Sequence, residues 1–296
     1  MLKIIFSFVI FINFLGSTNA ASILVKTSEN PVNCKFVTIH IEGEIVSNDS
    51  ELFKSNLKYV LDKYGNECKK GNGQIILSSS GGDIYEAIKI GRLIRQNEFE
   101  TDVAIRGECI SACVLIFASG VNRVTDVPLG IHRPYLANAK NNLSSVELRK
   151  IITQMNEDVR SYLSEMNISD ELYNLMLSIA PEEVKFIGYD ELKKYRLVGK
   201  DNYFEESQTY EYAKRYDLSL IEYRKRNQIA SKKCFTNEYL SSNDRFKPTD
   251  CLNSVYIGIS QSEAKRRREF GHSKCSRITN LDEHDSCFKS YLLYSK

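Results

Sequence analysis

Short segments in which apolar and polar residues alternate are separated by segments in which apolar residues recur every three or four positions. The alternating or short apolar segments, typical of strands, are 36–43, 74–77, 101–105 and 127–131. The segments with helical spacing are 50–64, 84–96, 111–119, a long one from Ser144, 169–179 and 190–195. This order predicts an α/β domain in which helices cover a mostly parallel sheet.

The pattern weakens near residue 200. The segment 201–296 is richer in Tyr, Asn, Ser, Lys and Arg, has little continuous apolar sequence, and contains Cys234, Cys251, Cys275 and Cys287. We therefore expect an α/β domain at 21–200 and a small disulfide-stapled module of unassigned role at 201–296. Pairing between neighbours, Cys234–Cys251 and Cys275–Cys287, is the connectivity that we favour.

Residues 1–20 have the composition of a signal peptide. Lys3 precedes an apolar run, 4–15, and small residues lead to Ala20. We expect cleavage after Ala20 and a periplasmic or secreted protein; an uncleaved N-terminal anchor is the alternative. In an oxidising compartment the eight cysteines favour disulfides. Because no CxxC pair occurs, we expect no metal site.

Charge gives no case for a nucleic-acid partner. The formal net charge is only +2. The basic run 265–268 is flanked by Glu263 and Glu269 and is interpreted as a solvated helix face.

One motif places a serine where a strand turns into a helix: Cys109-Ile-Ser-Ala-Cys113. Taken alone, Ser111 is most simply a helix N-cap. As a nucleophile, it would leave the N–H of the small residue Ala112 free to face an oxyanion. For Cys109 and Cys113 we expect pairing or burial rather than nucleophilic chemistry.

Two further groups complete the parts of a serine hydrolase. Gly81 and Gly82 follow the strand 74–77 and form either a tight turn or, through the N–H of Gly82, a second oxyanion donor. His132 follows the strand 127–131 and could take the serine proton. His40, within a strand pattern and away from any nucleophile motif, is interpreted as structural. In parallel sheets the carboxyl ends of strands share one edge, where these groups would meet.

Three motifs together resemble the Clp protease proteolytic subunit family, within the Clp/crotonase fold. They are Ser-Gly-Gly at 80–82, Cys-Ile-Ser-Ala-Cys at 109–113 and Ile-His-Arg-Pro at 131–134, and the segment 186–198 is similar to the family's closing segment. The likeness covers about residues 35–200 and is nearest to exported Clp-like proteins of Gram-negative bacteria. It implies a spiral of ββα units, a protruding helix supplied from Ser144, Ser111 as nucleophile, His132 as base, and an oxyanion hole at Gly82 and Ala112.

The chain departs from the family in three places. Ser80 replaces a proline, and Val184 stands where the triad aspartate aligns. Glu183 would orient His132 after a one-residue shift; otherwise the site is a Ser-His dyad or is impaired. The segment 135–140 replaces a glycine-rich segment that forms ring contacts in the family, so a homo-oligomer is left open.

These observations favour an exported serine peptidase that acts on peptides or proteins without a cofactor. No ATPase partner is expected, because Clp unfoldases act in the cytoplasm. The rival hypothesis is a catalytically impaired Clp-fold binding or scaffold protein, which Val184 supports. A crotonase-type acyl-CoA enzyme fits less well, because coenzyme A is cytoplasmic. A Ser-Lys dyad that uses Lys140 is a weaker enzymatic variant.

Overall fold

The computed structural model describes residues 21–29, 35–64, 73–136 and 144–294. The chain divides into two compact units, Met1–Asp201 and Asn202–Lys296, so the division lies one residue after the boundary expected from the sequence. The expected signal peptide, Lys140, Cys34 and Cys68 lie outside the described residues. Within the described residues, no helix has the length and apolar character needed to cross a bilayer.

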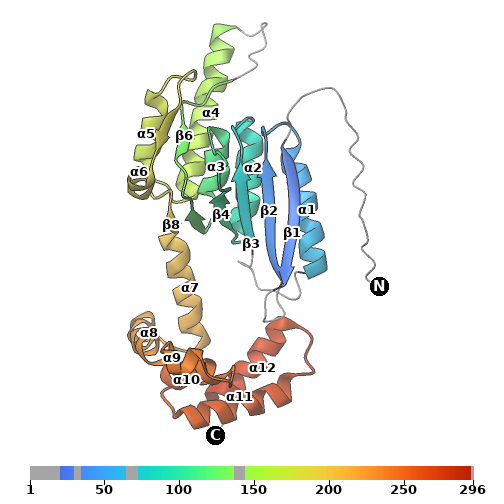
Figure 1. The fold of residues 1–296 in the computed structure, drawn as a ribbon, viewed down its shortest axis with the longest axis vertical. Coiled ribbons are helices and arrows are strands. Elements are labelled where there is room, and N and C mark those ends of the chain that lie inside the picture. The colour runs from blue at the N-terminus through green and yellow to red at the C-terminus, as the bar shows by residue number, and fades with distance from the viewer. Residues whose placement is uncertain (1–20, 30–34, 65–72, 137–143, 295–296) are drawn as a thin grey trace, which may run out of the picture. The chain divides into compact units, whose positions relative to one another are not determined.

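The first unit is built on a six-stranded sheet in the order β1-β2-β3-β4-β5-β8 (Figure 1). Its strands are β1 (Ser22–Glu29), β2 (Lys35–Glu42), β3 (Gly73–Ser78), β4 (Glu100–Val103), β5 (Asn122–Val124) and β8 (Gly199–Lys200). The four central strands, β2 to β5, are parallel, and β1 and β8 pair antiparallel at the edges. The predicted α/β class and mostly parallel sheet are confirmed.

Helices separate the strands as the apolar spacing predicts. They are α1 (Asp49–Tyr64), α2 (Ile84–Gln96), α3 (Ala112–Ala118), α4 (Ser145–Glu165), α5 (Asp170–Ser178) and α6 (Tyr189–Lys194). In Figure 1, α1, α2 and α3 lie behind the sheet. The long helix α4 begins with a capping box, in which Ser144 Oγ accepts from the N–H of Glu147 and the Glu147 carboxylate accepts from the N–H of Ser144.

The hydrophobic core lies where the central strands meet these helices. In β3 buried and half-buried residues alternate, and Ile75 and Leu77 are inaccessible to solvent. Their neighbours in register are Ile39 and Ile41 of β2, which are equally buried. Because successive side chains of a strand point to opposite faces, residues two apart share a face. The three isoleucines and Leu77 therefore lie on the same face of the sheet.

One strand is not in the sheet where the sequence analysis expected it. β6 (Leu129–Ile131), which leads into His132, pairs antiparallel with β7 (Lys185–Ile187) in a separate two-stranded sheet. The expectation that His132 and Ser111 follow strands of one sheet is therefore wrong. A single-residue bridge between Gly130 of β6 and Ile110 joins this strand to the segment before α3.

The second unit consists of helices. They are α7 (Asn202–Arg215), α8 (Leu220–Cys234), α9 (Asn237–Leu240), α10 (Lys247–Ile257), α11 (Gln261–Cys275) and α12 (Leu281–Tyr294). Disulfides join Cys234 to Cys251 and Cys275 to Cys287, which confirms the favoured pairing. They crosslink α8 to α10 and α11 to α12, in a unit whose buried apolar cluster is small.

Aromatic stacking and ion pairs supply the rest of this unit's interior. Tyr256 stacks on Tyr216 and Tyr223, with ring centroids 4.6 and 5.1 Å away, and burial raises the pKa of Tyr216 to about 12. Arg268 forms two hydrogen bonds with Asp250, whose side chain is 2 % exposed. Arg267 donates to carbonyl groups of α12. Half of the basic run 265–268 is thus packed into the unit, and its interpretation as a wholly solvated face is wrong.

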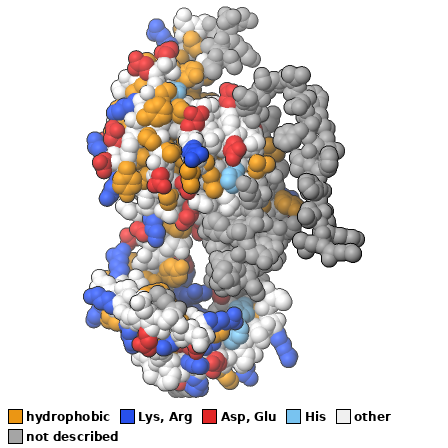
Figure 2. All heavy atoms as spheres, in the orientation of Figure 1, with side chains coloured by type: hydrophobic (Ala, Val, Ile, Leu, Met, Phe, Trp, Pro, Cys, Tyr) orange, Lys and Arg blue, Asp and Glu red, His pale blue; other side chains and the backbone are white. Residues whose placement is uncertain are grey.

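Charged side chains are mixed on the molecular surface. On the face drawn in Figure 2, Lys and Arg side chains are interspersed with Asp and Glu. Lys265 and Arg266, the exposed half of the basic run, form ion pairs with Asp244 and Glu263.

Candidate active site

Short backbone bridges hold the segment before α3. Ser79, just beyond β3, is bridged to Cys109, and Ile110 is bridged to Gly130 of β6. The N–H of Ile110 donates to the Ser79 carbonyl at 3.0 Å, and the N–H of Ser111 donates to the Gly130 carbonyl at 2.8 Å. Ser111 is therefore fixed between the end of β3 and β6, at the point where the chain turns into α3.

Ser111 has a strained backbone. Its φ is 57° and its ψ is −122°, a region that residues with a Cβ seldom occupy. Such conformations cost roughly 1–3 kcal/mol and cluster at functional sites. The side chain does not cap α3 and forms no hydrogen bond with any described residue. Ser111 thus occupies the N-cap position of α3, as its simplest interpretation predicts, but its hydroxyl does not cap the helix and remains unused within the described residues.

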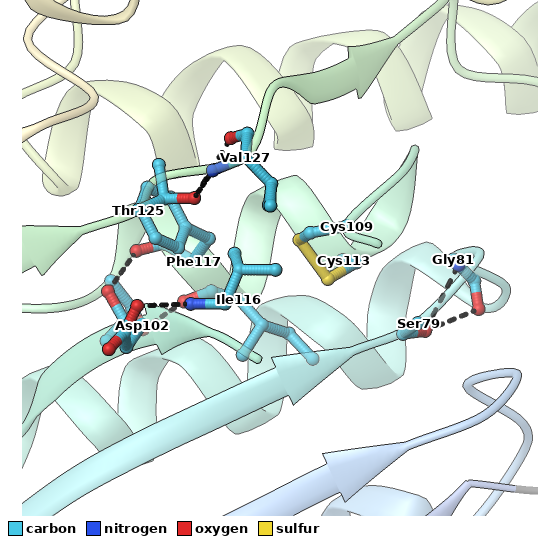
Figure 3. The surroundings of a disulfide bond; sticks show 12 residues. Ser79, Gly81, Asp102, Cys109, Cys113, Ile116, Phe117, Thr125 and Val127 are labelled. Carbon is cyan, nitrogen blue, oxygen red and sulfur yellow. Dashed lines mark hydrogen bonds between the residues drawn. A yellow bond between two sulfur atoms is a disulfide. The ribbon is translucent and has the colours of Figure 1, made fainter. Parts of the chain in front are cut away.

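A disulfide brackets this serine. Cys109 and Cys113 are bonded to each other and are inaccessible to solvent. Figure 3 shows the bridge joining the loop before α3 to the first turn of that helix. The expected pairing is confirmed, and neither sulfur is a thiol nucleophile.

The backbone N–H groups of Gly81 and Gly82 differ in whether they already donate a hydrogen bond. Gly81 and Gly82 have φ values of 104° and 133°. The N–H of Gly81 donates to Ser79 Oγ at 3.1 Å (Figure 3). The N–H groups of Gly82 and Ala112 donate to no group in the described part of the chain. The two N–H groups that the sequence analysis selected as oxyanion donors are thus unused.

Gly81 is packed against Ser111 so closely that a side chain would not fit. A Cβ on Gly81 would lie 2.8 Å from Ser111 Cβ and 2.7 Å from the Ile110 carbonyl oxygen. The positive φ and this close approach both require glycine.

His132 is buried, with 7 % of its surface exposed. Its Nδ1 lies 2.9 Å from the carbonyl oxygen of Arg133. Since a carbonyl only accepts hydrogen bonds, Nδ1 is the protonated nitrogen of the neutral ring. The lone pair is then on Nε2, which is the form that a general base needs. Ser111 and His132 border the same pocket, but no hydrogen bond joins their side chains.

The structure does not bring Glu183 to the histidine. Among the described residues, no carboxylate forms a hydrogen bond or an ion pair with the ring of His132. Glu183 is exposed. Val184 lies just before β7, as His132 lies just after β6, and the last pair between the two strands is Ile131 with Lys185. The side chain of Val184 faces Gly130, where a Cβ would lie 2.9 Å from Val184 Cγ1.

Ser111 and His132 line a pocket of about 650 Å³, a size typical of ligand sites. Its wall also includes Ser80, Gly81, Gly82 and several residues that the sequence analysis did not select: Glu44, Ile45, Val46, Ser47, Asp83, Ile84, Tyr85, Tyr135, Leu136 and Met155. The loop 44–47 follows the carboxyl end of β2, the position at which parallel sheets form sites, so that rule could have indicated it. Met155 belongs to the apolar stripe of α4 and carries no such signal.

Two buried carboxylates accept hydrogen bonds from the backbone of residues 46 and 50, which follow the start of the pocket loop. Asp49 Oδ2 accepts from the N–H of Val46 at 2.7 Å, and Glu86 accepts from the N–H of Ser50 at 2.8 Å. Burial raises the pKa of Asp49 above its ordinary range. Burial and the nearby carboxylate of Asp158 also raise the pKa of Tyr85, another residue that lines the pocket.

Compared with models of protein families and with curated proteins, this chain matches none of them. Within the described residues, no group of three or more His, Cys, Asp and Glu side chains is arranged to hold a metal ion. The chemistry of the pocket must therefore be argued from its own geometry.

Proposed function

We propose that this chain is an exported serine peptidase of the Clp/crotonase type that acts without ATP, with Ser111 as nucleophile and His132 as base. The observation that carries the proposal is the backbone of Ser111. A serine held at φ 57° and ψ −122° between a bridged segment and a helix, with an unused hydroxyl in a pocket, has the geometry of a nucleophile elbow.

The reaction follows from the groups around the pocket. His132 Nε2 takes the proton of Ser111 Oγ, which attacks the carbonyl carbon of the substrate. The N–H groups of Gly82 and Ala112 stabilise the oxyanion. His132 then gives the proton to the departing amine as the C–N bond breaks, and water releases the acyl group by the same steps in reverse. The Arg133 carbonyl keeps the proton of the neutral ring on Nδ1, so the site works as a dyad.

Export is proposed on two grounds. Residues 1–20 have the signal-peptide pattern, and three disulfides bond six of the described cysteines. We expect the mature chain to begin at Ala21 and to be recovered from the periplasm or the medium. N-terminal sequencing that returned Met1 from a membrane fraction would contradict this.

Hydrolysis by the purified mature chain tests the activity. We expect turnover of activated esters and short peptides, abolished in Ser111→Ala and in His132→Gln. Ser47→Ala is the matched control, because Ser47 lines the same pocket but has no proposed role. Activity that survived in Ser111→Ala would refute the assignment.

A non-catalytic binding or scaffold protein is the second candidate. The observation that favours it is the missing hydrogen bond between Ser111 and His132, together with the absence of an acidic partner for the ring in the described part of the chain. Under this hypothesis the wild type binds peptides in the pocket, and Ser111→Ala binds them equally well, but no ester or peptide is cleaved.

A further inference from the structure

The lysine-free and arginine-free lining of the described pocket wall is acidic. Among the described residues that line it, two are acidic, Glu44 and Asp83, and none is a lysine or an arginine. A cationic group in this pocket would therefore lie near two carboxylates, with no lysine or arginine of the described wall to repel it. This asymmetry sets which substrate side chains the pocket can hold.

The two carboxylates differ in how far their charge is already compensated. Asp83 is the N-cap of α2, and its Oδ1 accepts from the N–H groups of Tyr85 and Glu86 at 2.9 and 3.0 Å. The positive end of the helix offsets part of its charge. Glu44 is exposed and forms no hydrogen bond or ion pair with a described residue. Among the described residues, Glu44 is thus the pocket carboxylate whose charge no partner offsets.

Backbone pairing fixes Glu44 near the reacting groups. The next residue, Ile45, is bridged to Gly82, with its N–H donating to the Gly81 carbonyl and its carbonyl accepting from the N–H of Asp83, each at 2.7 Å. Gly81 in turn abuts Ser111. Glu44 is therefore next in sequence to a residue whose backbone is hydrogen-bonded to the segment 81–83, which carries the proposed oxyanion donor Gly82.

The same pocket has apolar lining for an aliphatic stem. Ile84 and Leu136 are partly exposed and line the pocket together with the buried Met155 of α4. Lysine and arginine side chains lie with their methylene groups on apolar surface and their charged end beside a polar group. A pocket lined both by apolar side chains and by the carboxylate of Glu44 suits such a side chain.

We propose that this pocket selects substrates with a lysine or arginine side chain next to the scissile carbonyl, and that Glu44 is the residue that determines this specificity. The inference rests on the proposed function for the cleavage step, but the preference for a cationic side chain is a property of binding alone. An acidic side chain is disfavoured, because it would face Glu44 and Asp83 with no compensating cation on the described wall.

Matched esters measure the preference. For N-acetyl-lysine, N-acetyl-norleucine and N-acetyl-glutamate p-nitrophenyl esters, we expect kcat/KM to fall in that order in the wild type. In Glu44→Gln, the ratio of the lysine to the norleucine kcat/KM should drop by roughly 2- to 5-fold, the effect of one exposed ion pair. Glu44→Lys should favour the glutamate ester over the lysine ester.

Two controls separate this charge effect from others. Glu171→Gln removes another exposed carboxylate, one that does not line the pocket, and should leave all three ratios unchanged. Raising the salt concentration should reduce the lysine preference of the wild type and have little effect in Glu44→Gln. Equal kcat/KM for the three esters in the wild type, or a lysine preference that persists in Glu44→Gln, would overturn the inference.

A binding arm keeps the inference independent of catalysis. The peptides acetyl-Ala-Ala-Lys-amide and acetyl-Ala-Ala-Glu-amide are titrated calorimetrically into Ser111→Ala and into Ser111→Ala/Glu44→Gln. Tighter binding of the lysine peptide that disappears in the double variant supports Glu44 even if the wild type cleaves no ester, a result that would refute only the proposed function. Equal affinity for both peptides overturns the specificity proposal and leaves the hydrolase proposal standing.

Discussion

Replacing Gly81 by alanine should displace the serine turn, because two separate penalties act at this position. The φ of 104° costs an L-residue about 1–2 kcal/mol. The added Cβ would also lie 2.7 Å from the Ile110 carbonyl oxygen and 2.8 Å from Ser111 Cβ, neither of which belongs to a flexible chain end. Overpacking of this kind costs about 1–3 kcal/mol. We expect Gly81→Ala to lose about 2–5 kcal/mol of unfolding free energy.

Two other glycines separate the penalties. Gly199 has a φ of 91°, and no atom lies within 4 Å of the position that a Cβ would take there, so Gly199→Ala measures the backbone penalty alone. Gly188 has a φ of −92° and equally open surroundings, so Gly188→Ala should remain within about 1 kcal/mol of the wild type. The unfolding free energies come from urea denaturation followed by circular dichroism.

The functional readout is ester hydrolysis under native conditions. Displacement of Ser111 by even a fraction of an ångström should lower kcat by at least about tenfold in Gly81→Ala. Gly199→Ala and Gly188→Ala should hydrolyse at the wild-type rate. If Gly81→Ala were as stable as Gly199→Ala and fully active, the close approach of Gly81 to Ser111 would have no functional meaning.

Four further predictions concern other contacts. Glu183→Gln should change turnover by at most about fivefold, since an exposed carboxylate contributes at most about 1 kcal/mol, whereas Val184→Asp, next to the last pair of β6 and β7, should raise turnover at least about tenfold over Val184→Asn. A large loss in Glu183→Gln, with no gain in Val184→Asp, would instead support a triad that uses Glu183. Cys109→Ala/Cys113→Ala should lower the unfolding free energy by about 2 kcal/mol and remove most of the hydrolysis. Full activity in this variant would show that the disulfide is not needed to hold Ser111 in place. Cys234→Ala/Cys251→Ala should cost about 3 kcal/mol, seen as an earlier transition in calorimetry, while hydrolysis persists; an unchanged thermogram would refute the stapling role. Burial raises the pKa of Asp49, so the folded state holds the carboxyl proton to higher pH than the unfolded state does. The contribution of this group to stability therefore falls as pH rises from the ordinary aspartate range through the raised pKa. Asp49→Asn should remove that fall, and parallel curves of unfolding free energy against pH for the two proteins would contradict it.

The sequence predicted the parts of the fold that depend on local periodicity. The strands at 36–43, 74–77 and 101–105 and the helices at 50–64, 84–96 and 144 onward match β2, β3, β4, α1, α2 and α4 within a few residues. Each has a buried face, so its apolar spacing reports its structure. β8 has two residues and both are exposed, and β5 has three, so neither leaves such a pattern.

The helices of the second unit were missed although the sequence holds their start signals. Ser219 and Ser260 accept from the N–H groups of Glu222 and Glu263, the same Ser-x-x-Glu spacing that predicted the helix at Ser144. Their apolar faces are narrow because ion pairs, tyrosine stacking and disulfides replace part of the core. Periodicity alone is therefore a weak signal in this unit.

The sequence indicated some of the residues of the candidate site but not how they are assembled. Motif order indicated Ser111, His132, Gly82 and Ala112, and Ser111, His132 and Gly82 line the pocket. Single-residue bridges, such as Ile110 to Gly130, hold the elbow, and a bridge of one residue has no periodicity to detect. The acceptor for His132 Nδ1 is a backbone carbonyl, so no side chain in the sequence could reveal it.

Covalent labelling shows whether Ser111 is a reactive nucleophile. The purified mature protein is incubated with a fluorophosphonate probe, digested, and the adduct located by mass spectrometry, with Ser111→Ala and Ser47→Ala as comparisons. We expect a single adduct on Ser111 in the wild type and in Ser47→Ala, and none in Ser111→Ala. An unlabelled wild type, or an adduct on another residue that persists in Ser111→Ala, would contradict the assignment of Ser111 as nucleophile.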